Sequence, residues 1–409
     1  MADSVNAHLQ ILRCLLYNSN LFMKTKKLAL AAVSAAVMFA SCSKDEVVNN
    51  QENSLHNYIG FSTVGSNAQT KATVYTSNNS FENFAVFAYN GTNLFMGGSA
   101  ETGVNIVKNE TAWEYQNSAD LAYWPKSTLN FYGVAPLKEN TGVNNYSWNI
   151  GSDEQKITYT TVDEYGVDAG TTNVDVMYGV KTQQTASSNN GVVKFNFKHI
   201  LSQILFQAKV QYASMVVNIE KINVHNVCGS GTFKFPSNES EVATRDGNWT
   251  SDGHVNFSVG FHSESVEEEG YIKVDGNNVD NAKIISKSDD NPLLLIPQTL
   301  TKWTTTAETK VPISEANINY QSYLEISCKI MQNGEYLFGS ESAYNTLYVP
   351  FGASWEPGKR YIYTLIFGGG FDVNGDPILS PITFDAEVSD WVDATDNNGD
   401  INTSEGGVN

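Results

Sequence analysis

The stretch that most constrains the fold of this chain is residues 195–210, FNFKHILSQILFQAKV. Its large side chains fall on odd positions as far as Leu201 and on even positions from Ile204 onward. Alternation with a period of two is the pattern of a β-strand that buries one face. A single change of parity within a strand is typical of a β-bulge. We therefore expect one strand here, bulged near Ser202–Gln203, with His199 and Leu201 facing the interior.

Short runs of the same kind recur along the chain, and no stretch has a long helical period. Turn-forming residues separate the runs, and the 20 Phe and 20 Tyr residues favour strands over helices. A chain of 409 residues is long enough for two domains that each bury a core. The sequence therefore predicts an all-β fold of two tandem β-sandwiches. The other expected strands are 58–63, 72–75, 84–89, 129–136, 174–179, 219–227, 232–235, 292–298, 323–331 and 382–388.

The charge and the motifs exclude several classes of function. A net charge of −19 argues against nucleic acid or an anionic membrane surface as a partner. The chain has no HExxH, GxSxG or P-loop motif, and the acidic runs 372–376 and 396–400 lack the glycine and glutamate of an EF-hand. We therefore expect no enzyme, no cofactor and no metal site. His254 and His262 are interpreted as ordinary strand residues.

Two further residue types are assigned structural roles. His199 lies on the face expected to be buried, where a hydrogen-bonded core histidine is far more common than a catalytic base. The four cysteines are too few for a disulfide scaffold. Cys228 and Cys328 would pair only if their strands are neighbours, which their spacing does not show. Cys328 shares a face with Leu324 and Ile326, so we take it as a buried free thiol.

Residues 1–41 are expected to be targeting sequence and not part of the fold. After Met23, three lysines precede a 13-residue apolar core, residues 28–40. That core is too short to cross a membrane and is typical of a signal peptide. Residues 1–22 would then be an upstream extension of the natural start.

Cys42 is the candidate site of lipid attachment. Residues 39–42, Phe-Ala-Ser-Cys, look like a lipobox, although the usual Leu or Val at its first position is replaced by Phe. Acylation of the Cys42 thiol would leave residues 42–57 as a polar, lipidated tether. A plain signal peptide followed by a chance cysteine is the alternative.

Several motifs resemble those of one protein family. They are the F-x-F-x-H-I-L-S-x-I run that begins the stretch described above, YWP and FYGxxP within residues 123–136, LLLIPQ at 293–298, and WxPGKxYxY at 355–363. Together they are similar to signatures of the fimbrillin and Mfa-like surface proteins of Bacteroidetes, the building blocks of type V pili. The resemblance covers about residues 42–391.

The resemblance implies a fold and a division of the chain. Members of the family are two transthyretin-like β-sandwiches in tandem, which here would be residues 58–187 and 188–392. Residues 393–409 are acidic and rich in Asn and Gly, so we expect them to form a mobile tail.

The resemblance also implies a function as a pilus subunit on the cell outer membrane, held there by the lipid anchor. In fimbrillins a trypsin-like protease cuts after Arg or Lys just before an Ala and removes the first strand, and Lys71–Ala72 matches that position. The removed strand would carry Ile59, Phe61 and Thr63, and a strand of another subunit would fill the groove. Lys71 as an ordinary surface lysine is the alternative.

A second hypothesis is a monomeric surface lipoprotein that binds glycan. Such a protein would keep its first strand and expose an aromatic platform. The platform residues, if exposed, would be Trp113, Tyr115, Tyr123 and Trp124, although in a sandwich such aromatics more often fill the core or the space between sheets. Host protein or glycan is then a further expected partner. The role as stalk, anchor or tip stays open, because the tail after Trp391 is a poor donor strand and strand 382–388 looks like part of a core.

Overall fold

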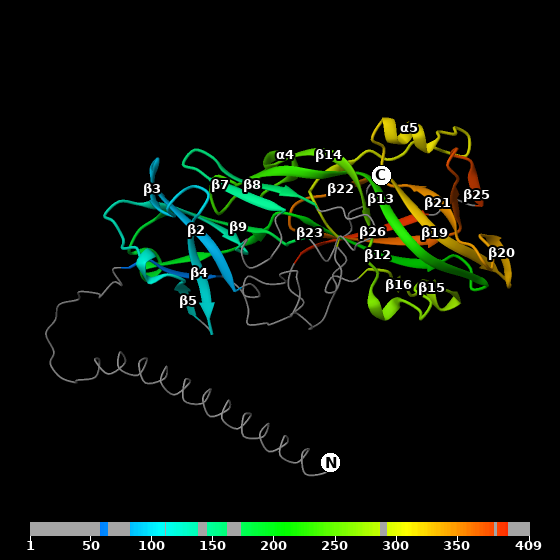
Figure 1. The fold of residues 1–409 in the computed structure, drawn as a ribbon, viewed down its shortest axis with the longest axis horizontal. Coiled ribbons are helices and arrows are strands. Elements are labelled where there is room, and N and C mark those ends of the chain that lie inside the picture. Colours follow the sequence, from blue (N-terminus) through cyan, green and yellow to red (C-terminus); the bar gives the residue numbers. More distant parts are fainter. Residues whose placement is uncertain are drawn as a thin grey trace, which may run out of the picture. The chain divides into compact units, whose positions relative to one another are not determined.

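The computed structural model describes residues 58–63, 82–110, 112–137, 145–161, 173–286, 293–379 and 383–391. All of them belong to one unit of the chain, Leu55–Asn409. Figure 1 shows that strands dominate this unit and that its helices are short. The predicted all-β class is confirmed. Among the described residues, no helix is long and apolar enough to cross a membrane.

The first part of the unit is a seven-stranded antiparallel sheet with the order β11-β9-β6-β2-β4-β5, in which β3 also pairs with β2. Strand β2 lies inside this sheet and is buried on both faces, which explains its continuous apolar run FAVFAY. The strands are β2 Asn83–Asn90, β3 Asn93–Met96, β4 Val104–Asn109, β5 Ala112–Tyr115, β6 Leu129–Ala135, β9 Met177–Gln184 and β11 Lys198–His199.

A separate two-stranded sheet joins β1, Gly60–Thr63, to β10, Val192–Phe195, in parallel. The side chains of Phe84, Val86 and Ala88 on one face of β2 belong to the same core cluster as β1 and β10. We call this cluster, which also contains Ile59, Phe61, Phe131 and Phe195, the first core. The other face of β2 packs in a second core.

The ten-stranded sheet is built on the 20-residue strand β13, Met215–Lys234, which pairs with β8, β14, β15 and β19. Its order is β25-β24-β21-β19-β13-β8-β7. Its other strands are β7 Tyr146–Ile150, β8 Gln155–Thr160, β14 Trp249–Ser258, β15 Ile272–Val274, β19 Tyr323–Gln332, β20 Glu335–Phe338, β21 Asn345–Pro350, β24 Gly369–Phe371 and β25 Pro377–Leu379.

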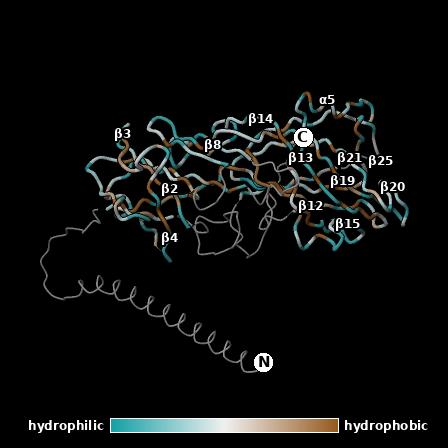
Figure 2. Tube along the Cα trace, in the orientation of Figure 1, coloured by the Kyte–Doolittle hydropathy of each residue, from teal (hydrophilic) through white to brown (hydrophobic). Residues whose placement is uncertain are grey.

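A five-stranded sheet has the order β16-β12-β23-β26, with β17 also paired to β12. Its strands are β12 Ser202–Val210, β16 Lys283–Ile284, β17 Leu293–Leu295, β23 Lys359–Phe367 and β26 Thr383–Asp390. A last pair joins β18 Thr299–Leu300 to β22 Ala353–Ser354. The helices are η1 Ser118–Asp120, η2 Ser188–Gly191, α4 Arg245–Asn248, η3 Ser263–Ser265, η4 Gly276–Asn278 and α5 Ile313–Ile318. Figure 2 shows hydrophobic and hydrophilic stretches in short alternation along the strands.

The prediction of one bulged strand over residues 195–210 is wrong. The stretch forms three strands, β10, β11 and β12, which pair in three different sheets. The parity changes because the chain passes from one sheet to the next. Leu201 is fully buried, as predicted. Ser202 and Gln203 are buried polar residues with partners, since the Ser202 hydroxyl donates to the Glu356 carbonyl (2.9 Å) and the Gln203 amide oxygen accepts from the Arg360 guanidinium (2.6 Å).

The two described cysteines are free thiols. Cys328 is buried in β19, as predicted, and burial raises the pKa of its thiol. Cys228 lies on β13 opposite His254 of β14, whereas Cys328 lies opposite Ile219. The two cysteines therefore occupy well-separated positions along β13 and its partner.

Candidate functional site: the first strand and its slot

Strand β1 buries one face and leaves the other half-buried. Ile59 and Phe61 are 0% and 6% exposed, while Gly60 and Ser62 are intermediate. This is the alternation that the sequence predicts for residues 58–63. Thr63 ends the strand opposite Phe195 of β10. The burial expected for Ile59 and Phe61 is therefore observed.

The backbone of Ile59 is held on both sides of its peptide group. Its N–H donates to the Ala122 carbonyl at 2.8 Å, and its carbonyl accepts from the Tyr115 hydroxyl at 2.8 Å. Burial raises the pKa of Tyr115, so the phenol remains a donor well beyond neutral pH. One residue earlier, Tyr58 forms an antiparallel bridge with Tyr123. These contacts fix the position of β1 relative to the residues around it.

Phe61 lies in a box of four aromatic rings. Tyr115, Phe84 and Phe131 meet it edge-on, with ring centroids at 5.7, 6.2 and 6.3 Å. Phe195 stacks parallel to it at 6.5 Å. Such pairs add to the energy of area burial, so Phe61 is the main apolar anchor of the strand. We call the residues around β1, namely Phe84, Tyr115, Ala122, Phe131 and β10, the β1 slot.

Strand β1 is short and pairs with a single strand. Its ladder comprises four residue pairs with β10, from Gly60↔Val192 to Thr63↔Phe195. A four-residue strand that pairs with one other strand, with Phe61 and the preceding Ile59 as apolar anchors, is a unit that another extended segment can imitate. Leaving the slot empty would expose aromatic side chains to water, which is costly.

Cys42, Lys71 and Ala72 lie outside the described residues. The sequence predicts Tyr115 as core fill or, if exposed, a platform residue, but it does not predict the hydrogen bond from its hydroxyl to Ile59. No sequence pattern links two residues that are 56 positions apart.

The aromatic residues considered for a glycan platform do not form one exposed surface. Trp113, Tyr115 and Trp124 pack against the first core. The Trp113 ring meets Phe84 at 5.0 Å, and the Trp124 indole N–H donates to the Gly191 carbonyl at 3.0 Å. Only Tyr123 of the four is largely exposed, at 59%. Three of the four therefore fill the core.

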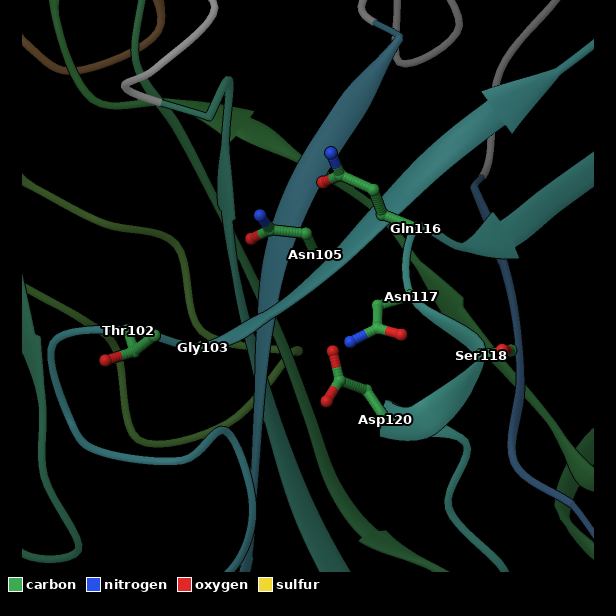
Figure 3. A pocket seen from close by; sticks show the side chains of 7 residues that line it. All are labelled: Thr102, Gly103, Asn105, Gln116, Asn117, Ser118 and Asp120. Carbon is green, nitrogen blue, oxygen red and sulfur yellow. The ribbon is translucent and has the colours of Figure 1, made fainter.

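A polar recess of about 600 Å³ lies near β4, β5 and η1. Figure 3 shows the Asn117 and Asp120 side chains pointing toward each other, with the amides of Asn105 and Gln116 above them. Its lining residues are Thr102, Gly103, Asn105, Gln116, Asn117, Ser118 and Asp120. The recess offers amide, hydroxyl and carboxylate groups but no aromatic ring.

The last strand, β26, is an edge strand of the five-stranded sheet and pairs only with β23. Its alternating pattern suggested a core strand, and this is wrong for residues 385–390, which are all exposed. Val388, expected on the apolar face, is 57% exposed. Sequence alternation shows which side chains share a face, but it does not show whether that face is covered in the fold.

Trp391 anchors the end of β26. It is buried, its ring stacks on His199 at 4.1 Å, and its backbone N–H donates to the Gly358 carbonyl at 3.0 Å. The His199 Nδ1 lies 2.9 Å from the buried Asp175 carboxylate. His199 is therefore a hydrogen-bonded structural histidine, as predicted, that connects β11 to the end of β26.

Two other polar clusters are held together by hydrogen bonds within the fold. The His225 ring stacks on Tyr323 and contacts Glu325 at 2.6 Å, and this hydrogen bond lowers the pKa of Glu325. Asp372 closes the hairpin turn between β24 and β25 by accepting from the Asn374 and Asp376 N–H groups. The described part of the chain contains no group of three side chains suited to a metal ion.

Comparison with known proteins places this fold in a family. The model of the fimbrillin-like family matches residues 70–391. The fimbrium subunit Fim1C of Phocaeicola vulgatus is 25% identical over 317 residues, covering 68% of this chain and 79% of its own length. The crystal structure of a fimbrial protein from Bacteroides vulgatus aligns with a TM-score of 0.53 and 15% identity, covering 82% of this chain and 99% of that one. The chain described here therefore belongs to the fimbrillin-like family.

Proposed function

We propose that the protein is a subunit of a surface fimbrium that assembles by strand exchange at the β1 slot. The observation that carries the proposal is the construction of β1: a four-residue strand paired with β10, with Phe61 held among four aromatic rings and the preceding Ile59 fully buried. The relative named a fimbrium subunit supports the same role. A strand from another subunit would restore the ladder to β10 and cover the same apolar surface.

We propose that a trypsin-like protease cuts between Lys71 and Ala72 and so releases β1. The site lies in the link between the end of β1 at Thr63 and the start of β2 at Asn83, so a cut there would separate β1 from the main sheet. While the link is intact, β1 occupies its slot at high effective concentration. After cleavage an external strand competes on equal terms.

Strand β26 is our candidate for the strand that this subunit donates. It lies at a sheet edge, its residues 385–390 are exposed, and it is anchored at its end by Trp391. Leaving the sheet would break one ladder and uncover little core. This property fits a donor better than the buried strands do.

The further parts of the proposal concern location and domains. We propose export as a lipoprotein acylated at Cys42 and display on the outer membrane, on the sequence pattern of residues 23–42. We also propose two tandem sandwiches, residues 58–187 and 188–392. Because Val193 and Phe195 pack in the first core, the opening residues of the second range also complete the first sandwich.

Trypsin treatment followed by unheated denaturing gels tests the assembly mechanism. Wild-type protein should yield heat-sensitive ladders, because a strand held by a full set of main-chain hydrogen bonds leaves slowly. Lys71→Ala should remain monomeric, and Lys126→Ala is the matched control that should still form ladders. Confirmed cleavage after Lys71 with no ladder, even after candidate partner subunits are added, would refute strand exchange.

A glycan-binding surface lipoprotein is the second candidate, and the polar recess is the observation that favours it. Its amides and carboxylate are groups that bind sugar hydroxyls. Glycan-array binding that is lost in Asn117→Ala and Asp120→Ala, together with a protein that stays monomeric after cleavage, would make it the better assignment.

A further inference from the structure

The β1 slot recognises a short sequence and not merely an extended backbone. We infer that its partner is a strand that runs parallel to β10 and carries an aliphatic residue, a small residue and an aromatic residue in that order. This inference rests on the proposed function, because it describes what enters the slot when β1 leaves. The partner is thus an extended segment of another subunit with this three-residue pattern.

The direction follows from the ladder. Gly60 pairs with Val192, Phe61 with Val193 and Ser62 with Lys194, so β1 and β10 run in the same direction. Parallel and antiparallel ladders place their hydrogen bonds differently, and a strand inserted in reverse would not meet the same donors and acceptors of β10. Reversal would also exchange the positions of the two anchors.

The position of Ile59 is recognised through its backbone hydrogen bonds and its burial. Ile59 is fully buried, and its N–H and carbonyl are both engaged, by the Ala122 carbonyl and the Tyr115 hydroxyl. These two contacts act on any residue at this place, so they set the register of the incoming strand. A polar side chain in this position would be buried among apolar groups without a partner, which is costly.

The aromatic position is read by the four-ring box. Centroid distances of 5.7–6.5 Å leave room for one ring between Tyr115, Phe84 and Phe195. An aliphatic side chain there would lose the edge-on contacts, and alanine would leave a cavity. The pattern therefore has an order: the ring has to follow the aliphatic residue by two positions.

The middle position favours a small residue. A Cβ on Gly60 would lie 3.3 Å from the Val192 Cγ2 and 3.8 Å from the Gly191 carbonyl oxygen. Alanine needs only a slight movement of Val192, but a branched side chain adds further atoms on the same side. The Gly60 φ is not in the left-handed region, so the restriction is one of space alone.

Peptide exchange on the nicked full-length protein tests the pattern. A specific protease site placed within residues 64–70 is cut under native conditions, so that β1 stays bound without a covalent link. Fluorescent peptides of residues 58–63 are then added, and anisotropy and release of the N-terminal fragment are measured. The key control exchanges Ile59 and Phe61 within the peptide, which preserves composition and reverses only the order.

We expect the native peptide to displace β1 and the exchanged peptide to bind at least about 100-fold more weakly. Phe61→Ala in the peptide should have a similar effect, and Gly60→Val a smaller one. Tyr115→Phe in the protein should weaken the native peptide roughly 3- to 10-fold, because one hydrogen bond to the backbone is lost. It should weaken a Ser62→Ala peptide by the same factor.

The possible outcomes test the recognition pattern and strand exchange separately. Equal displacement by the native and exchanged peptides would overturn the recognition pattern and leave strand exchange standing. Failure of every peptide, the native one included, to displace β1 from the nicked protein would overturn both. Displacement by the native peptide alone supports both.

Discussion

At the level of single residues, the sequence predicts most of the buried positions within residues 195–210 but not the residues that contact them. Leu201 is buried as its strand period indicates. The ammonium of Lys198, which alternates with His199 in the strand pattern, donates to the carbonyls of Glu239 and Glu241, and burial lowers its pKa. A period of two shows which side chains of a strand share a face. It does not show which groups of a distant loop contact that face.

Leu201→Ala should lower the free energy of unfolding by about 2–5 kcal/mol, because the site is fully buried and cannot collapse completely. Leu121→Ala, at a position that is 38% exposed, is the control and should cost much less. Lys198→Ala should cost more than the ~0.5 kcal/mol typical of a surface site. Urea denaturation measures all three, and similar values for Leu201 and Leu121 would show that the burial is wrong.

The His225–Glu325 contact predicts a pH dependence. Its hydrogen bond lowers the pKa of Glu325 in the folded protein, so the stabilisation is present above the unfolded value of about 4.3 and is lost as pH falls through the folded value. Glu325→Gln should therefore cost up to about 1 kcal/mol at pH 7. The difference from wild type should shrink in urea titrations as pH falls below the unfolded value of about 4.3. A constant difference across this range would contradict the assignment.

At the scale of elements, the terminal strands differ most from what their patterns suggest. The alternation in Ile59 and Phe61 correctly indicates a buried face. The same alternation occurs in β26, but residues 385–390 of that strand are exposed. Alternation records which side chains share a face, but only the tertiary structure decides whether another layer covers it. The three strands within residues 195–210 show the same limit. A change of sheet and a β-bulge both shift the apolar residues from odd to even positions, so the sequence alone does not distinguish them.

Trp391→Ala should loosen β26 without unfolding the protein. The indole stack on His199 is the buried contact at the end of a strand whose described side chains are otherwise exposed. Hydrogen exchange of residues 383–390 should accelerate by about tenfold or more, while β12 stays protected. Val388→Ala, on the exposed part of the same strand, should leave exchange unchanged. Equal protection in wild type and Trp391→Ala would remove Trp391 as the anchor.

At the scale of the whole molecule, the all-β class and the family follow from motifs that the sequence displays openly, such as residues 293–298 and 355–363. The β1 slot does not, because it is assembled from segments near residues 60, 84, 115, 131 and 193. Each segment has the pattern of an ordinary strand or turn. These segments come into contact only because of the order in which the strands are arranged in the fold.

Thiol labelling should report opening of the ten-stranded sheet. Cys328 is fully buried in β19 and burial raises its pKa, so it should react with a maleimide only when the sheet opens. Burial raises the pKa of Cys228 too, but this thiol is partly exposed and should react in the native state. Peptide mass mapping distinguishes the two sites. Fast native labelling of Cys328 would mean that this part of the core opens far more often than its packing implies.

The length of β13 has a mechanical consequence. Its first half forms ten registered pairs with β19 and its last five residues pair with β8, so one strand bridges two groups of partners. Tension applied between β8 and β19 would pull along this strand and load its ladders in shear. Bonds loaded in shear share the force and fail together, whereas bonds loaded by peeling fail one after another. A force applied between these two groups of partners would therefore be shared by the many hydrogen bonds that β13 forms along its length.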